Sequence, residues 1–255
     1  MAKAVWNHTA ENDCTGVDGA RVSNVSDKYK NGDYLAKNPD WHRTDSLWKA
    51  TRVRDILKGG GVEPRSICEV GCGAGDVLMH MKEMYPDTMM TGYDISTDAT
   101  QFWSEHEERG IEFCCGDFLE RNQQKYDCIL LIDLIEHLND PHAFLGAVRE
   151  SAKYFVFHFP LDLSVSTVFR ERLLVDIREK VGHIHYFSKE LAFALLRECG
   201  FEVMNWQYTN ASLNAPDRSL KTRIAALPRR IAYAVNKDVG VRLLGGETLM
   251  VLARV

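Results

Sequence analysis

One stretch of the chain, residues 67–77, constrains its fold more than any other. It reads ICEVGCGAGDV, so a short apolar run ends in three glycines spaced by single residues, Gly71, Gly73 and Gly75. This pattern predicts a buried strand, a tight turn and a helix whose N-terminus points at the same place as the turn. Glycine is needed there because a Cβ would block both the turn and the close approach of a ligand. The helix is indicated by apolar side chains at three-to-four-residue spacing, at Val77, Leu78, Met81 and Met84.

The spacing of these glycines argues against a dinucleotide-binding site. The dinucleotide fingerprint G-x-G-x-x-G, counted from Gly71, requires a glycine at position 76, where this chain has Asp76. Glu69 lies at the expected carboxyl end of the strand, where a buried carboxylate is costly unless it has a partner or faces a ligand. A nicotinamide-dependent oxidoreductase of similar fold is therefore kept only as an alternative.

The rest of the chain alternates expected strands with expected helices. Such alternation predicts an α/β fold with a doubly wound, mostly parallel sheet. Apolar runs predict strands at 66–70, 89–95, 111–115, 126–132, 154–159, 201–208 and 248–253. Helical spacing and capping residues predict helices from 46 onward, after the glycines, and at 98–108, 141–152 and 188–197. The first of these helices has an apolar face made by Leu47, Ala50, Val53, Ile56 and Leu57.

Further motifs follow the second, third and fourth predicted strands. Asp94 closes the second strand, where doubly wound sheets place an acid that accepts hydrogen bonds from ribose hydroxyls. The sequence CGDF at 115–118 follows the third strand, and IDLIEHL at 132–138 ends the fourth. Each motif alone is more easily explained as a helix cap or a turn. Their joint occurrence in this order favours a single shared ligand site.

Together with Glu69, the E-x-G-x-G-x-G pattern resembles the first motif of class I S-adenosylmethionine (SAM) methyltransferases. The D-x-x-E-H-L sequence at 133–138 is similar to the fourth motif of the small-molecule enzymes in that family, and the whole resemblance covers about residues 66–201. It implies a Rossmann-like, mostly parallel seven-stranded sheet, with an antiparallel last strand and a small accessory lobe.

The resemblance also implies a cofactor and the residues that hold it. The cofactor would be SAM, with S-adenosylhomocysteine (SAH) as its product. In the family an acid after the third strand contacts the adenine amino group, a role that falls to Asp117, and the next residue, Phe118, packs on the ring. The full set of implied cofactor residues is Glu69, Gly71, Cys72, Gly73, Gly75, Asp94, Ile95, Asp117, Phe118 and Asp133.

Composition narrows the class of protein and its compartment. Hydrophobic content of 45% and charged content of 26% are ordinary for a globular protein. The net charge of −5 argues against a nucleic-acid partner. No segment approaches the roughly 20 apolar residues of a membrane span, and the N-terminus lacks the apolar core of a signal peptide. Seven cysteines without a C-x-x-C pair favour reduced thiols, so a cytoplasmic location is expected.

Four regions lie outside the alternating core. Residues 1–25 are expected to be a disordered lead, and residues 26–60 a helical and aromatic lid over the substrate. Residues 61–255 would form the methyltransferase domain, with insertions at about 161–186 and 209–246 that build a substrate lobe beyond the carboxyl ends of the strands. Basic residues at 218–230 are expected to form a solvated surface rather than a membrane contact, and Pro228 to break any helix there. The lid residues are Tyr29, Tyr34, Trp41 and His42.

Methyl transfer from a sulfonium is a direct displacement, so the protein must chiefly align the reactants and exclude water. A hydroxyl acceptor also needs a general base, and His137, just past the fourth strand, is the first candidate. His183 and His185, which close the first insertion, are the second candidates. An H-x-H pair can bind metal, but no acid lies near it in sequence, so no metal is expected. His158 is expected to be a satisfied core histidine.

The acceptor is expected to be a small molecule, methylated on an oxygen of a sugar or natural product. The D/N-P-P-Y signature of many amino-methylating enzymes is absent from the end of the fourth strand, where the chain reads IDLIEH. This lowers the case for an adenine or glutamine nitrogen as the target. Two further alternatives remain: nitrogen or carboxyl methylation of a peptide or protein, and a SAM-binding protein of the same fold without catalysis. The sequence makes no prediction of oligomeric state.

Overall fold

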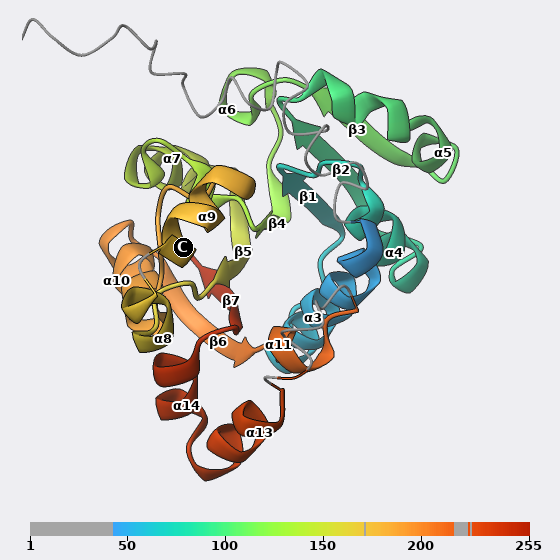
Figure 1. The fold of residues 1–255 in the computed structure, drawn as a ribbon. Coiled ribbons are helices and arrows are strands. Elements are labelled where there is room, and N and C mark those ends of the chain that lie inside the picture. Colours follow the sequence, from blue (N-terminus) through green and yellow to red (C-terminus); the bar gives the residue numbers. More distant parts are fainter. Residues whose placement is uncertain (1–42, 171, 217–223, 225) are drawn as a thin grey trace, which may run out of the picture.

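The computed structural model describes residues 43–170, 172–216, 224 and 226–255 (Figure 1). Its centre is a seven-stranded sheet in the order β3-β2-β1-β4-β5-β7-β6. Neighbouring strands from β3 to β5 pair in parallel, whereas β7 runs antiparallel to both β5 and β6. The expected fold class, with its antiparallel last strand, is therefore confirmed. The strands are β1 (Ser66–Val70), β2 (Met89–Asp94), β3 (Ile111–Cys115), β4 (Tyr126–Ile132), β5 (Ala152–Pro160), β6 (Glu202–Tyr208) and β7 (Thr248–Arg254).

Helices cover both faces of this sheet (Figure 1). On one face, α3 (Ser46–Gly59), α4 (Asp76–Met84) and the 3-10 helix η2 (Thr97–Phe102) pack into one apolar core. On the other, α7 (Pro141–Val148) and α10 (Lys189–Glu198) pack into a second. The central strands are buried on both sides, which is why they read in the sequence as continuous apolar runs. Short helices complete the core: η1 (Arg43–Asp45), α5 (Ser104–Glu107), α6 (Phe118–Arg121), η3 (Ile135–His137) and η4 (Arg149–Ser151).

Two of the expected helices differ from those observed. The expected helix at 98–108 is η2 followed by the single turn of α5, and the Thr100 hydroxyl bonds back to the carbonyl of Thr97 at 2.8 Å. Such local bonds compete with regular helix. The expected helix at 141–152 ends at Val148, because Ala152 turns extended and begins β5.

The apolar face expected on α3 also needs a correction. Leu47 is 53% exposed, and Ser46 takes the buried position one turn before Ala50. The other four residues expected on that face, Ala50 among them, are buried.

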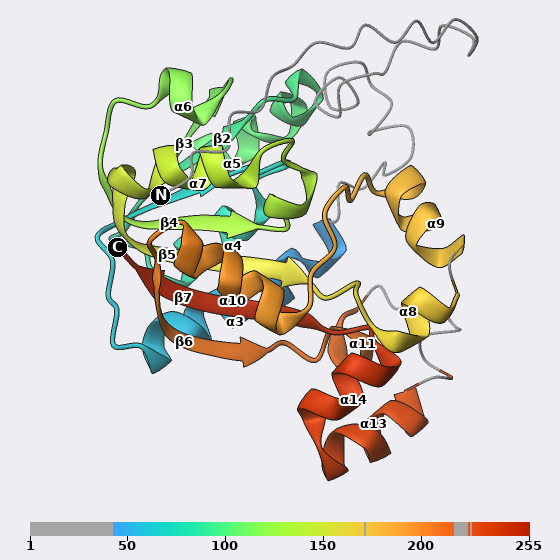
Figure 2. The ribbon, with the colours of Figure 1, turned by 90° about the vertical axis from the view of Figure 1, so that its left-hand side faces the viewer.

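Both insertions are helical and lie at the same end of the sheet (Figure 2). They follow the carboxyl ends of β5 and β6, which run in the same direction because both pair antiparallel with β7. Pro228 does not break the helix there, since α13 continues through it to Val235. The insertion helices are α8 (Val165–Phe169), α9 (Arg172–Lys180), α11 (Ala211–Asn214), α13 (Ala226–Val235) and α14 (Lys237–Leu244).

Several expectations fall outside the described residues. They are the lead at 1–25, the lid residues Tyr29, Tyr34, Trp41 and His42, and most of the basic segment at 218–230. Among the helices of the described part, none has the length and apolar character needed to cross a membrane. The cytoplasmic location stays a prediction.

Candidate active site

The glycine turn after β1 has the backbone conformation that its sequence predicts. Gly71, Gly73 and Gly75 have φ values of 77°, 53° and 85°, in the left-handed region that favours glycine. A Cβ on Gly75 would lie 2.7 Å from the ring of Phe113, so a side chain is excluded there by contact as well as by strain. Gly75 immediately precedes α4, which brings the N-terminus of that helix to the turn.

Asp94, at the end of β2, ties the turn to the neighbouring strand. One carboxylate oxygen accepts a hydrogen bond from the amide of Gly73 at 2.8 Å, and the other accepts one from the amide of Ser96 at 2.8 Å. Burial nevertheless raises the pKa of the Asp94 carboxyl. The indole of Trp103 donates to the Gly73 carbonyl at 2.8 Å, so the turn is held from two elements.

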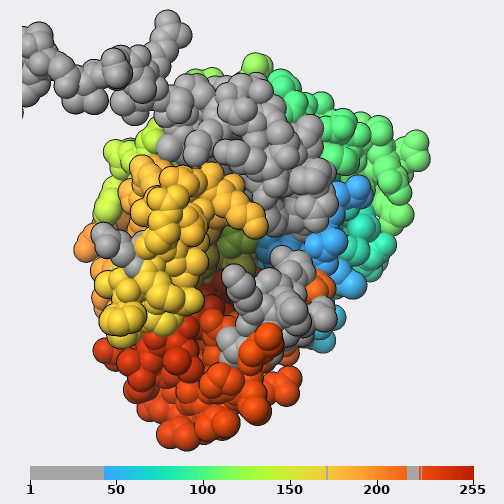
Figure 3. All heavy atoms as spheres, in the orientation of Figure 1, coloured from blue at the N-terminus to red at the C-terminus, as the bar shows by residue number. Residues whose placement is uncertain are grey.

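A cavity of about 680 Å³ opens at the carboxyl ends of β1, β2 and β4. This volume is in the range of small-molecule sites. A recess also separates the gold surface of residues 161–186 from the blue surface of α3 (Figure 3). All ten residues implied as cofactor contacts line the cavity, together with His137: Glu69, Gly71, Cys72, Gly73, Gly75, Asp94, Ile95, Asp117, Phe118 and Asp133.

Asp117 and Phe118 lie side by side at the start of α6. The exposed Asp117 carboxylate caps this helix by accepting a hydrogen bond from the amide of Leu119 at 2.8 Å. Phe118 is buried and meets the ring of Tyr93 edge-on, with centroids 5.1 Å apart. The chain therefore places a carboxylate and an aromatic ring next to each other on the same wall of the cavity.

Glu69 is the buried acid of the site. Its side chain is 2% exposed, and burial raises the pKa of the carboxyl to about 8, although the nearby Lys49 ammonium opposes the shift. One carboxylate oxygen accepts no hydrogen bond from the described residues. The carboxyl is therefore held mostly neutral at the floor of the cavity.

Lys49 is a site residue that the sequence analysis missed. Its ammonium lies 3.0 Å from a carboxylate oxygen of Asp133 and 3.0 Å from one of Asp45. Burial disfavours the charged form of Lys49, but the two carboxylates outweigh it and raise the pKa of the ammonium. Two features of the sequence could have indicated Lys49: it lies beside the apolar face of α3, and the acid Asp45 precedes it by four residues.

Asp133 has its side chain engaged on both oxygens. Its second oxygen accepts a hydrogen bond from Nδ1 of His158 at 2.6 Å, and its backbone has a φ of 50°, unusual outside glycine. Burial disfavours the carboxylate, but His158 and Lys49 hold the pKa of Asp133 well below its usual range. His158 is 1% exposed and also contacts the hydroxyl of Thr248 at 2.8 Å, which confirms it as a satisfied core histidine.

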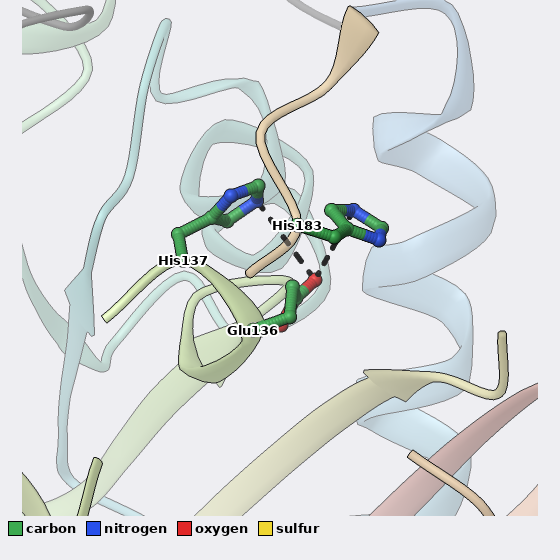
Figure 4. Close-up of side chains that lie close together, drawn as sticks. All are labelled: Glu136, His137 and His183. Carbon is green, nitrogen blue, oxygen red and sulfur yellow. Dashed lines mark ion pairs between the residues drawn. The ribbon is translucent and has the colours of Figure 1, made fainter. Parts of the chain in front are cut away.

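Glu136, His137 and His183 form a cluster where the first insertion meets the loop after β4 (Figure 4). Glu136 is 0% exposed, and its Oε1 lies 4.0 Å from Nε2 of His137 and 3.9 Å from Nε2 of His183. Burial raises the pKa of the Glu136 carboxyl well above its usual range. The Glu136 carbonyl accepts the amides of Ile184 and His185, which fastens the insertion to η3.

The structure groups the three candidate base histidines differently from the sequence expectation. His183 lies against His137, with ring centroids 5.0 Å apart, rather than acting as a pair with His185. Nε2 of His185 donates to the carbonyl of Leu138 at 2.9 Å. Among the three, only His137 lines the cavity.

Comparison with known proteins agrees with this architecture. Residues 41–205 match the family described as methyltransferase domain. A malonyl-[acyl-carrier protein] O-methyltransferase of Acetivibrio thermocellus is 27% identical over 120 residues, covering 46% of this chain and 42% of that protein. Ajmaline N-methyltransferase of Rauvolfia serpentina is 30% identical over 116 residues, covering 41% and 40%. The chain spans less than half the length of these two curated relatives.

A solved structure extends the likeness to most of the fold. Magnesium protoporphyrin IX methyltransferase from Synechocystis with bound SAH superposes with a TM-score of 0.55 at 14% identity, covering 82% of each chain. At that identity the likeness shows the fold alone. The family match spans more than half of the chain, and it does not support the nicotinamide alternative. The chain belongs to the class I SAM-dependent methyltransferases.

Proposed function

We propose that the cavity binds SAM and that the protein transfers its methyl group to an oxygen of a small molecule such as a sugar or natural product. The observation that carries this proposal is the convergence of four separate sequence motifs on one cavity. Residues from the ends of β1, β2, β3 and β4 line it together, and His137 lies on the same surface. Motifs that were only ordered in sequence thus become neighbours in space.

Each part of the donor has a matching part of the cavity. The glycine turn would approach the methionine portion, and Asp94 would accept the ribose hydroxyls. A carboxylate has about four lone-pair sites, so Asp94 can take these bonds while keeping the amides of Gly73 and Ser96. Asp117 and Phe118 would hold the adenine by a hydrogen bond and by packing.

The reaction we propose is a balanced displacement. The acceptor oxygen forms a bond to the methyl carbon, the bond from that carbon to the sulfonium breaks, and the hydroxyl proton is released. SAM becomes neutral SAH. We assign acceptor activation to the cluster of Glu136, His137 and His183, with His137 as the member placed to meet the acceptor, since it lines the cavity. An amine acceptor with a free lone pair has less need of such a cluster.

Nitrogen methylation is the second candidate function. Among the relatives, one is named an O-methyltransferase and another an N-methyltransferase, so they leave the acceptor atom open. The titratable cluster beside the cavity favours oxygen.

Two measurements, made one after the other, test the proposal. Calorimetric titration of the full chain with SAM and with SAH should show saturable binding, while NADH should not bind. Labelled SAM should then be offered with panels of hydroxyl, phenol, carboxylate and amine acceptors. Transfer to hydroxyl or phenol oxygens supports the proposal. Transfer to amines or peptides alone would replace it with the nitrogen alternative, and failure to bind SAM would overturn it.

A further inference from the structure

The two histidines of the Glu136 cluster are oriented by partners on their far side. Nδ1 of His183 donates to a carboxylate oxygen of Asp162 at 2.6 Å. Nδ1 of His137 lies 3.1 Å from the carbonyl of Gly182, which can only accept, so this nitrogen carries its proton. In the neutral ring, each Nε2 then presents a lone pair. Nε2 of His137 and Nε2 of His183 lie 4.0 Å and 3.9 Å from the same carboxylate oxygen of Glu136 (Figure 4).

This arrangement is one that metal sites use. A histidine ligand usually donates its other ring N–H to a carboxylate or a backbone carbonyl, which fixes the tautomer and aims the free nitrogen at the ion. The cluster has one example of each: a carboxylate behind His183 and a carbonyl behind His137. The expectation of no metal rested on the lack of acids near His183 in sequence, but the fold brings Glu136 and Asp162 to it.

The Glu136 carboxylate supplies an independent observation. It is 0% exposed, and neither oxygen accepts a hydrogen bond from another described residue. At 3.9 and 4.0 Å the two histidines are beyond hydrogen-bond distance. A buried carboxylate that lacks such bonds is costly, and a cation between the three side chains removes that cost.

We propose that Glu136, His137 and His183 bind a divalent transition-metal cation. One ligand atom from each residue lies within 4.8 Å of the others. Tetrahedral bonds of about 2.0–2.1 Å put ligand atoms about 3.4 Å apart, so binding requires the Glu136 oxygen and each histidine nitrogen to approach by roughly half an ångström. The two histidine nitrogens, which lie within 4.8 Å of each other, must also close to that separation. Two imidazoles and one carboxylate suit Zn²⁺, Fe²⁺ or Co²⁺, whereas Mg²⁺ and Ca²⁺ prefer all-oxygen sites.

The proposed cation would activate the acceptor of the proposed methyl transfer, so its role rests on that proposed function. Three protein ligands leave a coordination position open, and one of the three ligands, His137, lines the cavity where the acceptor would bind. An acceptor hydroxyl in that position loses its proton to solvent more easily, because the cation stabilises the alkoxide. The oxygen then takes the methyl group from the sulfonium. In this account His137 acts as a ligand and does not itself take the proton.

The direct test is metal binding by the full chain after chelator treatment. Zn²⁺ titration by calorimetry should give one equivalent per chain, and Co²⁺ should give visible absorption bands of a nitrogen-ligated site. Mg²⁺ at millimolar concentration should not compete. His183→Ala should abolish stoichiometric binding, and Asp162→Asn should weaken it by about 10–100-fold, because Asp162 orients His183. Glu136→Gln is the second ligand variant, with thermal melting to check that the buried replacement leaves the chain folded.

His185→Ala is the matched control, because His185 is on the same segment but bonds to the Leu138 carbonyl. It should bind Zn²⁺ like the wild type. Absence of stoichiometric Zn²⁺, or equal affinity in the wild type and His183→Ala, would overturn the inference.

The metal inference and the proposed function can fail separately. Methyl transfer that survives chelation and ignores added Zn²⁺ would remove the cation, leave the methyltransferase intact, and return His137 to the role of base. Failure to bind SAM would remove the proposed function, whatever the metal result.

Discussion

The two ends of the cavity are built in different ways. The glycine-turn end is made of backbone and short motifs: Gly71 to Gly75, with Asp94 holding the amide of Gly73. At the other end, side chains from distant segments meet: Lys49 from α3 lines the cavity, and Glu136 from η3 and His183 from the first insertion lie against His137. The first end depends on local conformation and the second on tertiary convergence. We therefore expect mutations to affect binding at one end and chemistry at the other.

The largest expected effect is on turnover at the convergent end. His137→Ala should lower the rate of methyl transfer by roughly 10²–10⁴-fold, because it removes the activation of the acceptor hydroxyl, whether His137 takes the proton or holds the cation that acidifies the hydroxyl. The affinity for SAM should change little, because nine of the ten implied donor contacts come from the ends of β1, β2 and β3. Single-turnover kinetics and calorimetry together measure the two quantities. An equal fall in both would show that the two ends are not independent.

The next largest expected effect is on the stability of the fold, at the same end of the cavity. Lys49→Met should lower the free energy of unfolding by about 3–5 kcal/mol, because it leaves the carboxylates of Asp45 and Asp133 without their shared cation. The depressed pKa of Asp133 adds a pH signature. The stabilisation that the Asp133 carboxylate gives the fold is present above the pKa that Asp133 has in the unfolded chain, and it is lost as pH falls. In Lys49→Met this stabilisation should be smaller.

Urea denaturation across acidic pH checks the Lys49 prediction. Lys58→Met is the control, because Lys58 is exposed on the same helix. If both variants unfold alike, the buried ion pair contributes nothing that a surface lysine does not.

A smaller effect is expected from overpacking the glycine turn. The new Cβ of Gly75→Ala would lie 2.7 Å from Phe113, at a φ of 85°. Such crowding costs about 1–3 kcal/mol, and if the turn shifts to relieve it, SAM affinity should fall by about 10–100-fold. Gly110→Ala provides the control, since Gly110 has a similar φ of 79° but no atom of a described residue within 4 Å of the position that its new methyl group would take. Equal SAM affinity in the two variants would mean that the turn does not approach the donor.

The last expected effect is a pH slope set by Glu69, which changes stability gradually with pH and removes no contact. Its pKa is about 8 in the folded chain, against an unfolded value near 4.5, so the folded state holds the proton more tightly. The resulting stability is present below the unfolded pKa and is lost as pH rises towards 8, by at most about 1.4 kcal/mol per pH unit. Thermal melting between pH 5.5 and 7.5 should show this slope, and Glu69→Gln should flatten it. Glu63→Gln, at an exposed position, should leave the slope unchanged.

The same contrast explains what the sequence could predict. The bounds of β1 and β4 were predicted to the residue, because strands buried on both faces are marked by apolar runs between polar turns. The ten implied donor contacts all line one cavity because short motifs follow each strand end. Local pattern therefore determines most of the glycine-turn end.

The convergent end could not be predicted in this way. Nothing near Glu136 in the sequence indicates that His183, 47 positions later, lies 3.9 Å from its carboxylate. Lys49 reaches Asp133 across an even longer separation, from a helix that precedes the first strand. Such contacts depend on how the insertion and α3 pack on the sheet. The error at Leu47 has the same origin, because its exposure depends on what α3 packs against.

The central claim is that the cavity at the glycine turn binds SAM. Differential scanning fluorimetry and calorimetry on the full chain, with SAM and with SAH, test it most directly. Ligand at 100 times its dissociation constant should stabilise the fold by about 2.7 kcal/mol. Saturable one-to-one binding, weakened in Gly75→Ala and retained in Gly110→Ala, is the predicted result. No binding of either compound, or binding insensitive to Gly75→Ala, would contradict the account.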